Sequence, residues 1–124
     1  MVSDPVSEEL RDFLNQHIDC IAQLEALLLM RADPAAEWSV AAMAGRLYAT
    51  AERAAEALTH LESEGLIIAG GSGYRYAASS AHAPMVEQLA HAYTHHLIAV
   101  TNIVHDKPPR IHQFADAFKL RRRT

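Results

Sequence analysis

Residues 50–77 read TAERAAEALTHLESEGLIIAGGSGYRYA, and this stretch decides the fold class. Ala54, Leu58 and Leu61 recur at four- and seven-residue spacing, which places their side chains on one face of a helix. Gly65 lies four residues after Leu61, and glycine readily adopts the positive φ found where helices end. The stretch therefore begins with a helix that ends at Gly65.

A β-hairpin is predicted immediately after that helix. Residues 66–69 and 74–77 are β-prone, and the segment 70–73 between them reads GGSG. Two such runs joined by a short glycine-rich segment are typical of a hairpin. Upstream, Ser39 can cap the start of another helix, and Trp38 can pack on Met43 of that helix as a hydrophobic staple. Two helices followed by a hairpin is the order of a winged helix.

The whole stretch 37–77, EWSVAAMAGRLYATAERAAEALTHLESEGLIIAGGSGYRYA, resembles the winged helix-turn-helix core of bacterial MarR-like transcriptional regulators. The most specific piece is Leu58-x-x-Leu61-Glu62-x-x-Gly65-Leu66-Ile67, which looks like the end of a recognition helix running into the first strand of a wing. The resemblance covers about a third of the chain. It implies that residues 50–61 form a recognition helix that enters the major groove of DNA.

One central helix is predicted before this core. It starts at Ser7, an N-cap followed by acidic residues, and ends at Asp33-Pro34 because a residue before proline is pushed out of helical geometry. Its apolar residues recur at three- and four-residue steps: Leu10, Phe13, Leu14, Ile18, Ile21, Leu24 and Leu28.

A second long helix is predicted from Pro84 to about His105, because Pro suits the first turn of a helix and no breaker follows. Six apolar residues alternate four- and three-residue steps along it, the seam of a helix that pairs lengthwise with a partner. We expect them to form a homodimer interface: Val86, Ala90, Tyr93, Leu97, Val100 and Val104.

These elements predict one domain over residues 1–124, mainly α with a small β-hairpin wing. The winged-helix core spans about 18–79, the dimerisation helix about 84–105, and a short helix with a basic tail 109–124. Half of the residues are hydrophobic and 21% are charged, which is typical of a globular protein and not of a disordered segment.

Composition excludes several kinds of protein. Cys20 is the only cysteine, so no internal disulfide and no thiolate cluster can form. The longest apolar run is far shorter than the ~20 residues that a membrane helix needs. We therefore expect a cytoplasmic location without membrane attachment. The formal net charge is −4, which argues against a broad basic surface for nucleic acid.

Candidate DNA contacts lie on the recognition helix and the wing: Arg46, Thr50, Arg53, Glu56, His60 and Arg75. Arg53, Glu56 and His60 form the expected outward set, and Arg75 would reach a minor groove. In the resemblance, Glu56 falls where MarR-like proteins commonly carry an arginine. Residues 37–77 hold three basic side chains and five acidic ones, so a solvated helix face explains Arg53 and Glu56 equally well.

No catalytic or metal site is predicted. His91 and His95 are four residues apart, a spacing that can bring two imidazoles to one metal, but they lie beside the apolar seam and read better as solvated or interface-rim histidines. No nucleophile triad or phosphate-binding glycine loop is present. We therefore expect a protein that is not an enzyme and needs no cofactor.

Three functions remain open. The first is a homodimeric transcriptional regulator of winged-helix type that binds double-stranded DNA. The second is a winged-helix protein-interaction module whose acidic helix face meets a basic protein partner, favoured by Glu52 and Glu56. The third is a metal-responsive regulator that uses His91 and His95.

Overall fold

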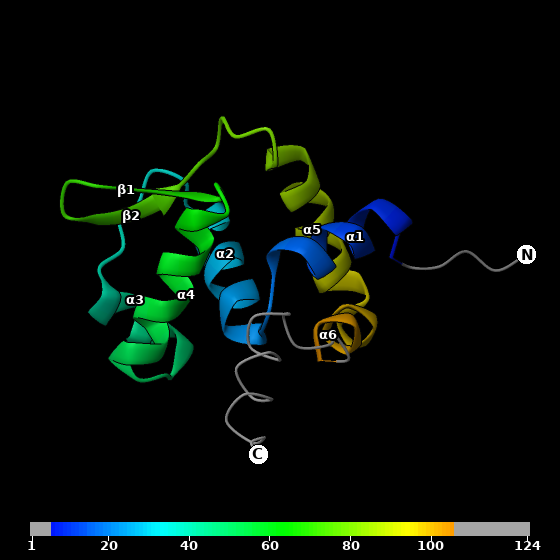
Figure 1. The fold of residues 1–124 in the computed structure, drawn as a ribbon, viewed down its shortest axis with the longest axis horizontal. Coiled ribbons are helices and arrows are strands. Elements are labelled where there is room, and N and C mark those ends of the chain that lie inside the picture. The colour runs from blue at the N-terminus through cyan, green and yellow to red at the C-terminus, as the bar shows by residue number, and fades with distance from the viewer. Residues whose placement is uncertain (1–5, 106–124) are drawn as a thin grey trace, which may run out of the picture.

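The computed structural model describes residues 6–105, which are mainly helical with one small antiparallel sheet. Figure 1 shows α3, α4 and the hairpin on one side of α2, and α1, α5 and α6 on the other. The elements in chain order are α1 (Glu8–His17), α2 (Ile21–Ala32), α3 (Val40–Leu47), α4 (Ala51–Ser63), β1 (Ile67–Gly70), β2 (Gly73–Tyr76), α5 (Ala83–His95) and α6 (Leu97–His105).

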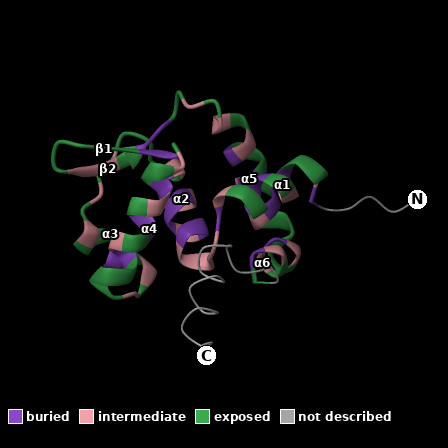
Figure 2. Cartoon of the chain, in the orientation of Figure 1, coloured by how far each residue is buried: buried purple, intermediate pink, exposed green. Residues whose placement is uncertain are grey.

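The central element is α2, which contacts α3, α4, α5, α6 and β2. Its buried side chains are Gln23, Leu24, Ala26, Leu27 and Met30. They belong to one continuous apolar cluster that also takes in residues of the other helices and of the hairpin. Figure 2 shows this buried zone along α2, with exposed residues on the outer sides of α3 and α4. The hairpin half and the C-terminal helices thus share one core.

The single central helix predicted from residue 7 to 32 is wrong, because the chain breaks at residues 18–20. Ile18 and Cys20 adopt extended conformations, and Ile18 is buried in the core. Gln23 secures the break, since its side-chain oxygen accepts a hydrogen bond from the Asp19 amide at 2.7 Å. Asp and Cys are weak helix formers. The chain therefore leaves the helix at Ile18, where an extended conformation buries the Ile18 side chain in the core.

The predicted helix ends are confirmed. The hydroxyls of Ser7 and Ser39 accept hydrogen bonds from backbone amides three residues later, at 3.1 and 3.0 Å. Gly65 has a φ of +78° and follows α4. The amide of Leu66 donates to the Leu61 carbonyl, and that of Gly65 to Glu62, both at 3.0 Å. This pair of bonds is a Schellman motif.

The hairpin is also confirmed, with Ile67 opposite Tyr76 and Gly70 opposite Gly73. A third segment joins it, because Trp38 forms an antiparallel bridge with Tyr74. The Trp38 amide donates a hydrogen bond to the Tyr74 carbonyl at 2.7 Å, and the Tyr74 amide donates one to the Trp38 carbonyl at 2.9 Å. The segment before α3 is therefore tied to β2.

The continuous helix predicted over 84–105 is wrong as well, since the chain leaves helical geometry at His96 (φ −139°, ψ 52°). Residues 93–96 read Tyr-Thr-His-His, all weaker helix formers than alanine. The break turns α6 relative to α5, so that Val100 and Val104 are buried while Leu97 is exposed.

The predicted short helix and basic tail over 109–124 lie outside the described residues. Within residues 6–105, no helix has the length and apolar character needed to cross a membrane.

Candidate functional site

The outward side of α4 carries two of the predicted DNA contacts. Arg53 and Glu56 are both exposed, and Arg75 is exposed on β2. Thr50 lies at the start of α4, where its hydroxyl accepts a hydrogen bond from the Arg53 amide at 3.1 Å. Thr50 therefore fixes the first turn of the helix.

His60 does not belong to this outward set, so its predicted orientation is wrong. Its ring lies between α4 and the α1–α2 junction, and its side chain is 17% exposed. The Nε2 atom is 2.6 Å from the His17 carbonyl oxygen. A carbonyl only accepts, so Nε2–H is the donor. His60 is thus held at the break between α1 and α2 and is turned away from the exposed face.

His17 continues this junction. Its Nδ1 lies 2.6 Å from Oε1 of Glu64 at the end of α4, and its ring contacts those of Phe13 and His82 with centroids 4.9 and 4.8 Å away. His82 immediately precedes α5. Imidazole contacts therefore connect the ends of α1 and α4 to the start of α5.

Arg46, in the last turn of α3, is exposed. Its guanidinium carbon lies 5.7 Å from the centroid of the Trp38 ring, within the range of a cation–π contact. Among residues 6–105 we find no ion pair of Arg46. Its role in DNA binding stays a prediction.

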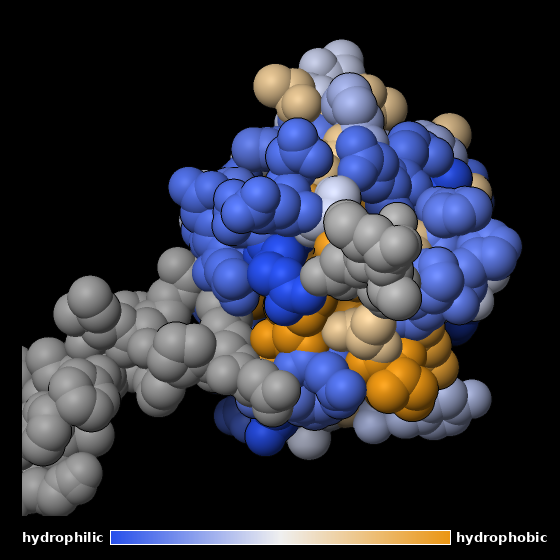
Figure 3. All heavy atoms as spheres, turned by 90° about the vertical axis from the view of Figure 1, so that its right-hand side faces the viewer, coloured by the Kyte–Doolittle hydropathy of each residue, from blue (hydrophilic) through white to orange (hydrophobic). Residues whose placement is uncertain are grey.

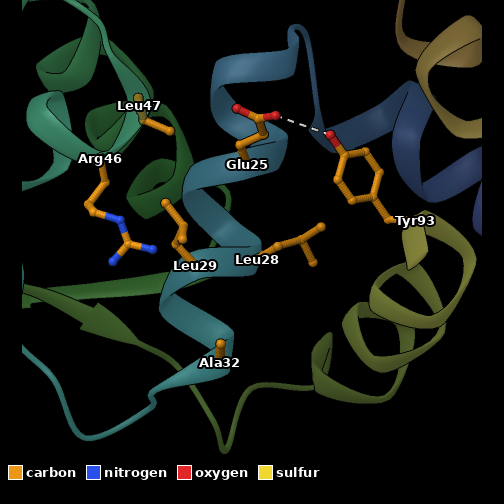
Figure 4. Close-up of a pocket in the computed structure, with 7 residues that line it drawn as sticks. All are labelled: Glu25, Leu28, Leu29, Ala32, Arg46, Leu47 and Tyr93. Carbon is orange, nitrogen blue, oxygen red and sulfur yellow. Dashed lines mark hydrogen bonds between the residues drawn. The ribbon is translucent and has the colours of Figure 1, made fainter. Parts of the chain in front are cut away.

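Arg46 also lines a groove with a volume of about 310 Å³. Figure 4 shows α2 along the middle of this groove, with Arg46 and Leu47 of α3 on one side and Tyr93 of α5 on the other. The lining residues are Glu25, Leu28, Leu29, Ala32, Arg46, Leu47 and Tyr93. The groove therefore has mostly apolar walls and one charged group of each sign.

Glu25 and Tyr93 are joined across the groove. The Tyr93 hydroxyl donates a hydrogen bond to Oε2 of Glu25 at 3.1 Å, as the dashed line in Figure 4 marks. Burial raises the pKa of Tyr93, and the Glu25 carboxylate raises it further because it disfavours a phenolate beside it. Tyr93 is therefore a neutral donor at physiological pH.

The six residues predicted to pair two copies do not share an open face. Val86, Val100 and Val104 are buried in the chain's own core, so this part of the predicted interface is wrong. Ala90 and Tyr93 are partly buried, and Leu97 is 46% exposed. Ile98, which is not one of the six predicted residues, is 70% exposed. Figure 3 shows an apolar area on the side of the molecule that carries α1, α5 and α6.

His91 and His95 are exposed near the end of α5. Their rings stack with centroids 4.1 Å apart, and Nδ1 of His95 donates to the His91 carbonyl at 2.9 Å. In the part of the chain that the structure describes, no group of three or more histidine, cysteine or carboxylate side chains could hold a metal ion.

Comparisons of the chain with protein-family models, with curated proteins and with solved structures give no match.

The groove was missed by sequence reasoning. Leu28 belongs to the apolar stripe predicted for the core helix, yet Leu28 and its neighbour Leu29 are only partly buried. Glu25 was the available signal, because it is a carboxylate inside an otherwise apolar run. Its partner Tyr93 is 68 residues away in sequence, and no local pattern connects the two.

Proposed function

We propose that this chain is a winged helix-turn-helix protein that binds double-stranded DNA as a transcriptional regulator and has no catalytic activity. The element order supports this: helix α2, the bridging segment at Trp38, helices α3 and α4, and then the hairpin. In this arrangement α4 packs on α2 and α3 and leaves its other face to solvent. That exposed face of α4 is the observation on which the proposal depends.

In the proposed complex α4 enters the major groove, and the hairpin is the wing. Arg53 contacts a phosphate or a guanine edge, and Glu56 accepts from a cytosine amino group. Arg75 extends from the wing toward a minor groove. Thr50 supports them by capping the helix that carries Arg53.

We further propose a homodimer, with the pairing surface on the exposed face of α6. Leu97, Ile98, Thr101, Asn102 and His105 share one side of that helix, and the set contains no lysine, arginine or carboxylate. A face without fixed charge can meet its own copy without repulsion. Two copies would present two α4 helices, as two half-sites of DNA require.

Fluorescence anisotropy with a labelled duplex of mixed sequence tests DNA binding. We expect affinity that falls steeply with salt, since phosphate contacts release counterions. Arg53→Gln and Arg75→Gln should each weaken binding and reduce the salt slope by about one. Arg31→Gln removes the same charge from the Arg31–Glu87 pair between α2 and α5 and should leave the slope unchanged. Binding that is absent at low salt would overturn the proposal.

The second candidate function is a protein-interaction module, favoured by the exposed carboxylates of Glu52, Glu56 and Glu62 on α4. One variant separates the two functions. Glu52→Gln should raise DNA affinity if α4 faces phosphates, because a repulsive charge is lost. The same variant should weaken binding to a basic protein surface if α4 faces a protein.

A further inference from the structure

The groove between α2, α3 and α5 has the character of a small-molecule site. Its volume of about 310 Å³ lies at the lower end of the range of ligand pockets, and such pockets combine apolar walls with a few polar groups. Leu28, Leu29 and Leu47 supply the apolar part. This size suits a compact organic molecule better than a peptide.

Arg46 supplies the positive group. The guanidinium lies over the face of Trp38 and forms no ion pair within residues 6–105, which leaves its N–H donors available. A planar guanidinium with free donors binds a carboxylate through two parallel hydrogen bonds. This side of the groove therefore favours an anionic group.

Glu25 supplies the opposite charge. Its Oε2 accepts a hydrogen bond from the Tyr93 hydroxyl, while its Oε1 forms no hydrogen bond or ion pair within residues 6–105. The hydrogen bond from Tyr93 on α5 helps to fix the orientation of the Glu25 carboxylate on α2. An ammonium group donates charge-assisted hydrogen bonds to a carboxylate, which are stronger than bonds between neutral groups.

We propose that this groove binds a small zwitterion whose carboxylate lies on Arg46, whose ammonium lies on Glu25, and whose apolar body covers Leu28, Leu29 and Leu47. A molecule with only one of these charges would leave the other protein charge without a partner. Selectivity for both ends is thus the distinguishing property. The site does not require DNA binding, and its test uses the free protein.

The test is a titration of the full chain with 4-(aminomethyl)benzoate, in which binding is measured by calorimetry and by amide NMR shifts. Two matched probes each lack one charge: 4-methylbenzoate and 4-methylbenzylamine. We expect saturable binding of the zwitterion, at least about tenfold tighter than either matched probe. The shifts should map to α2, α3 and α5. A lack of saturable binding at millimolar zwitterion would overturn the proposal, and so would equal affinities for the three probes.

Variants assign the two ends. Arg46→Met should weaken the zwitterion about tenfold and leave 4-methylbenzylamine unchanged. Glu25→Gln should weaken the zwitterion similarly and leave 4-methylbenzoate unchanged. Glu62→Gln, an exposed carboxylate on α4, is the control and should change neither. If both groove variants keep their urea midpoints but bind all three probes as the wild type does, the site is wrong.

Discussion

At the scale of single residues, Tyr48 is the clearest case of a side chain that the fold does not need. It lies in the turn between α3 and α4 with a φ of +54°, and it is 97% exposed. A bulky residue in the left-handed region costs about 1 kcal/mol or more, whereas glycine adopts it freely.

Tyr48→Gly should therefore raise the free energy of unfolding by about 0.5–1 kcal/mol, after part of the relief is offset by the greater freedom of glycine in the unfolded chain. Urea denaturation measures this gain. Tyr48→Ala keeps the Cβ atom and the strain, and it should give no gain. Equal destabilisation by both substitutions would contradict the reading.

Two other tyrosines set a limit on stability at high pH. Burial raises the pKa of Tyr76 and of Tyr93, and nearby carboxylates raise both further. The unfolded chain then loses these protons first, so their contribution is present below a pH of about 10 and is lost as the pH rises through the folded values. Tyr93→Phe should reduce the fall of the urea midpoint above pH 10. Tyr48→Phe, at an exposed position, should leave that fall unchanged; the same reduction from both variants would argue against this cause.

At the scale of elements, the bridge between Trp38 and β2 depends on one glycine. A Cβ atom on Gly73 would lie 2.3 Å from the Trp38 carbonyl oxygen, whereas one on Gly70 would meet nothing within 4 Å. Gly73→Ala should destabilise the protein by about 2–3 kcal/mol, because the backbone of the bridge must move. Gly70→Ala should change stability by less than about 0.5 kcal/mol. Similar urea midpoints for the two variants would contradict the close approach.

Local chemistry explains which elements could be predicted. The Ser7 and Ser39 caps, the Gly65 stop and the hairpin turn each depend on neighbouring residues, and all were predicted correctly. The breaks at Asp19 and His96 were missed because neither carries proline or glycine. Tertiary packing sets both breaks, because interrupting the helices allows Ile18 and Val100 to be buried in the core.

The candidate site was less predictable for the same reason. Exposure of Arg53, Glu56 and Arg75 follows from local pattern. The inward turn of His60 depends on the carbonyl of His17, 43 residues away, and the groove depends on the Glu25–Tyr93 pair. Contacts between residues so far apart in the sequence cannot be predicted from the spacing of apolar residues.

At the scale of the whole molecule, the proposed dimer makes its own prediction. Ile98→Glu places a charge at a position that is 70% exposed, so it should leave the urea midpoint of the monomer nearly unchanged. In a dimer the substitution would bury two carboxylates, one from each copy, and burying a charge without a partner is unfavourable. Sedimentation velocity should show a dimer for the wild type and a monomer for the variant. Glu87→Gln, on α5 outside this face, is the control, and a wild-type monomer at high concentration would reject the dimer.

Selection of the full chain against a randomised duplex library measures whether α4 recognises DNA sequence. We expect enrichment of an inverted repeat whose half-sites lie about 10 base pairs apart, or a multiple of that, and loss of this enrichment in Arg53→Gln. A library that stays random over repeated rounds, with folded protein throughout, would contradict it.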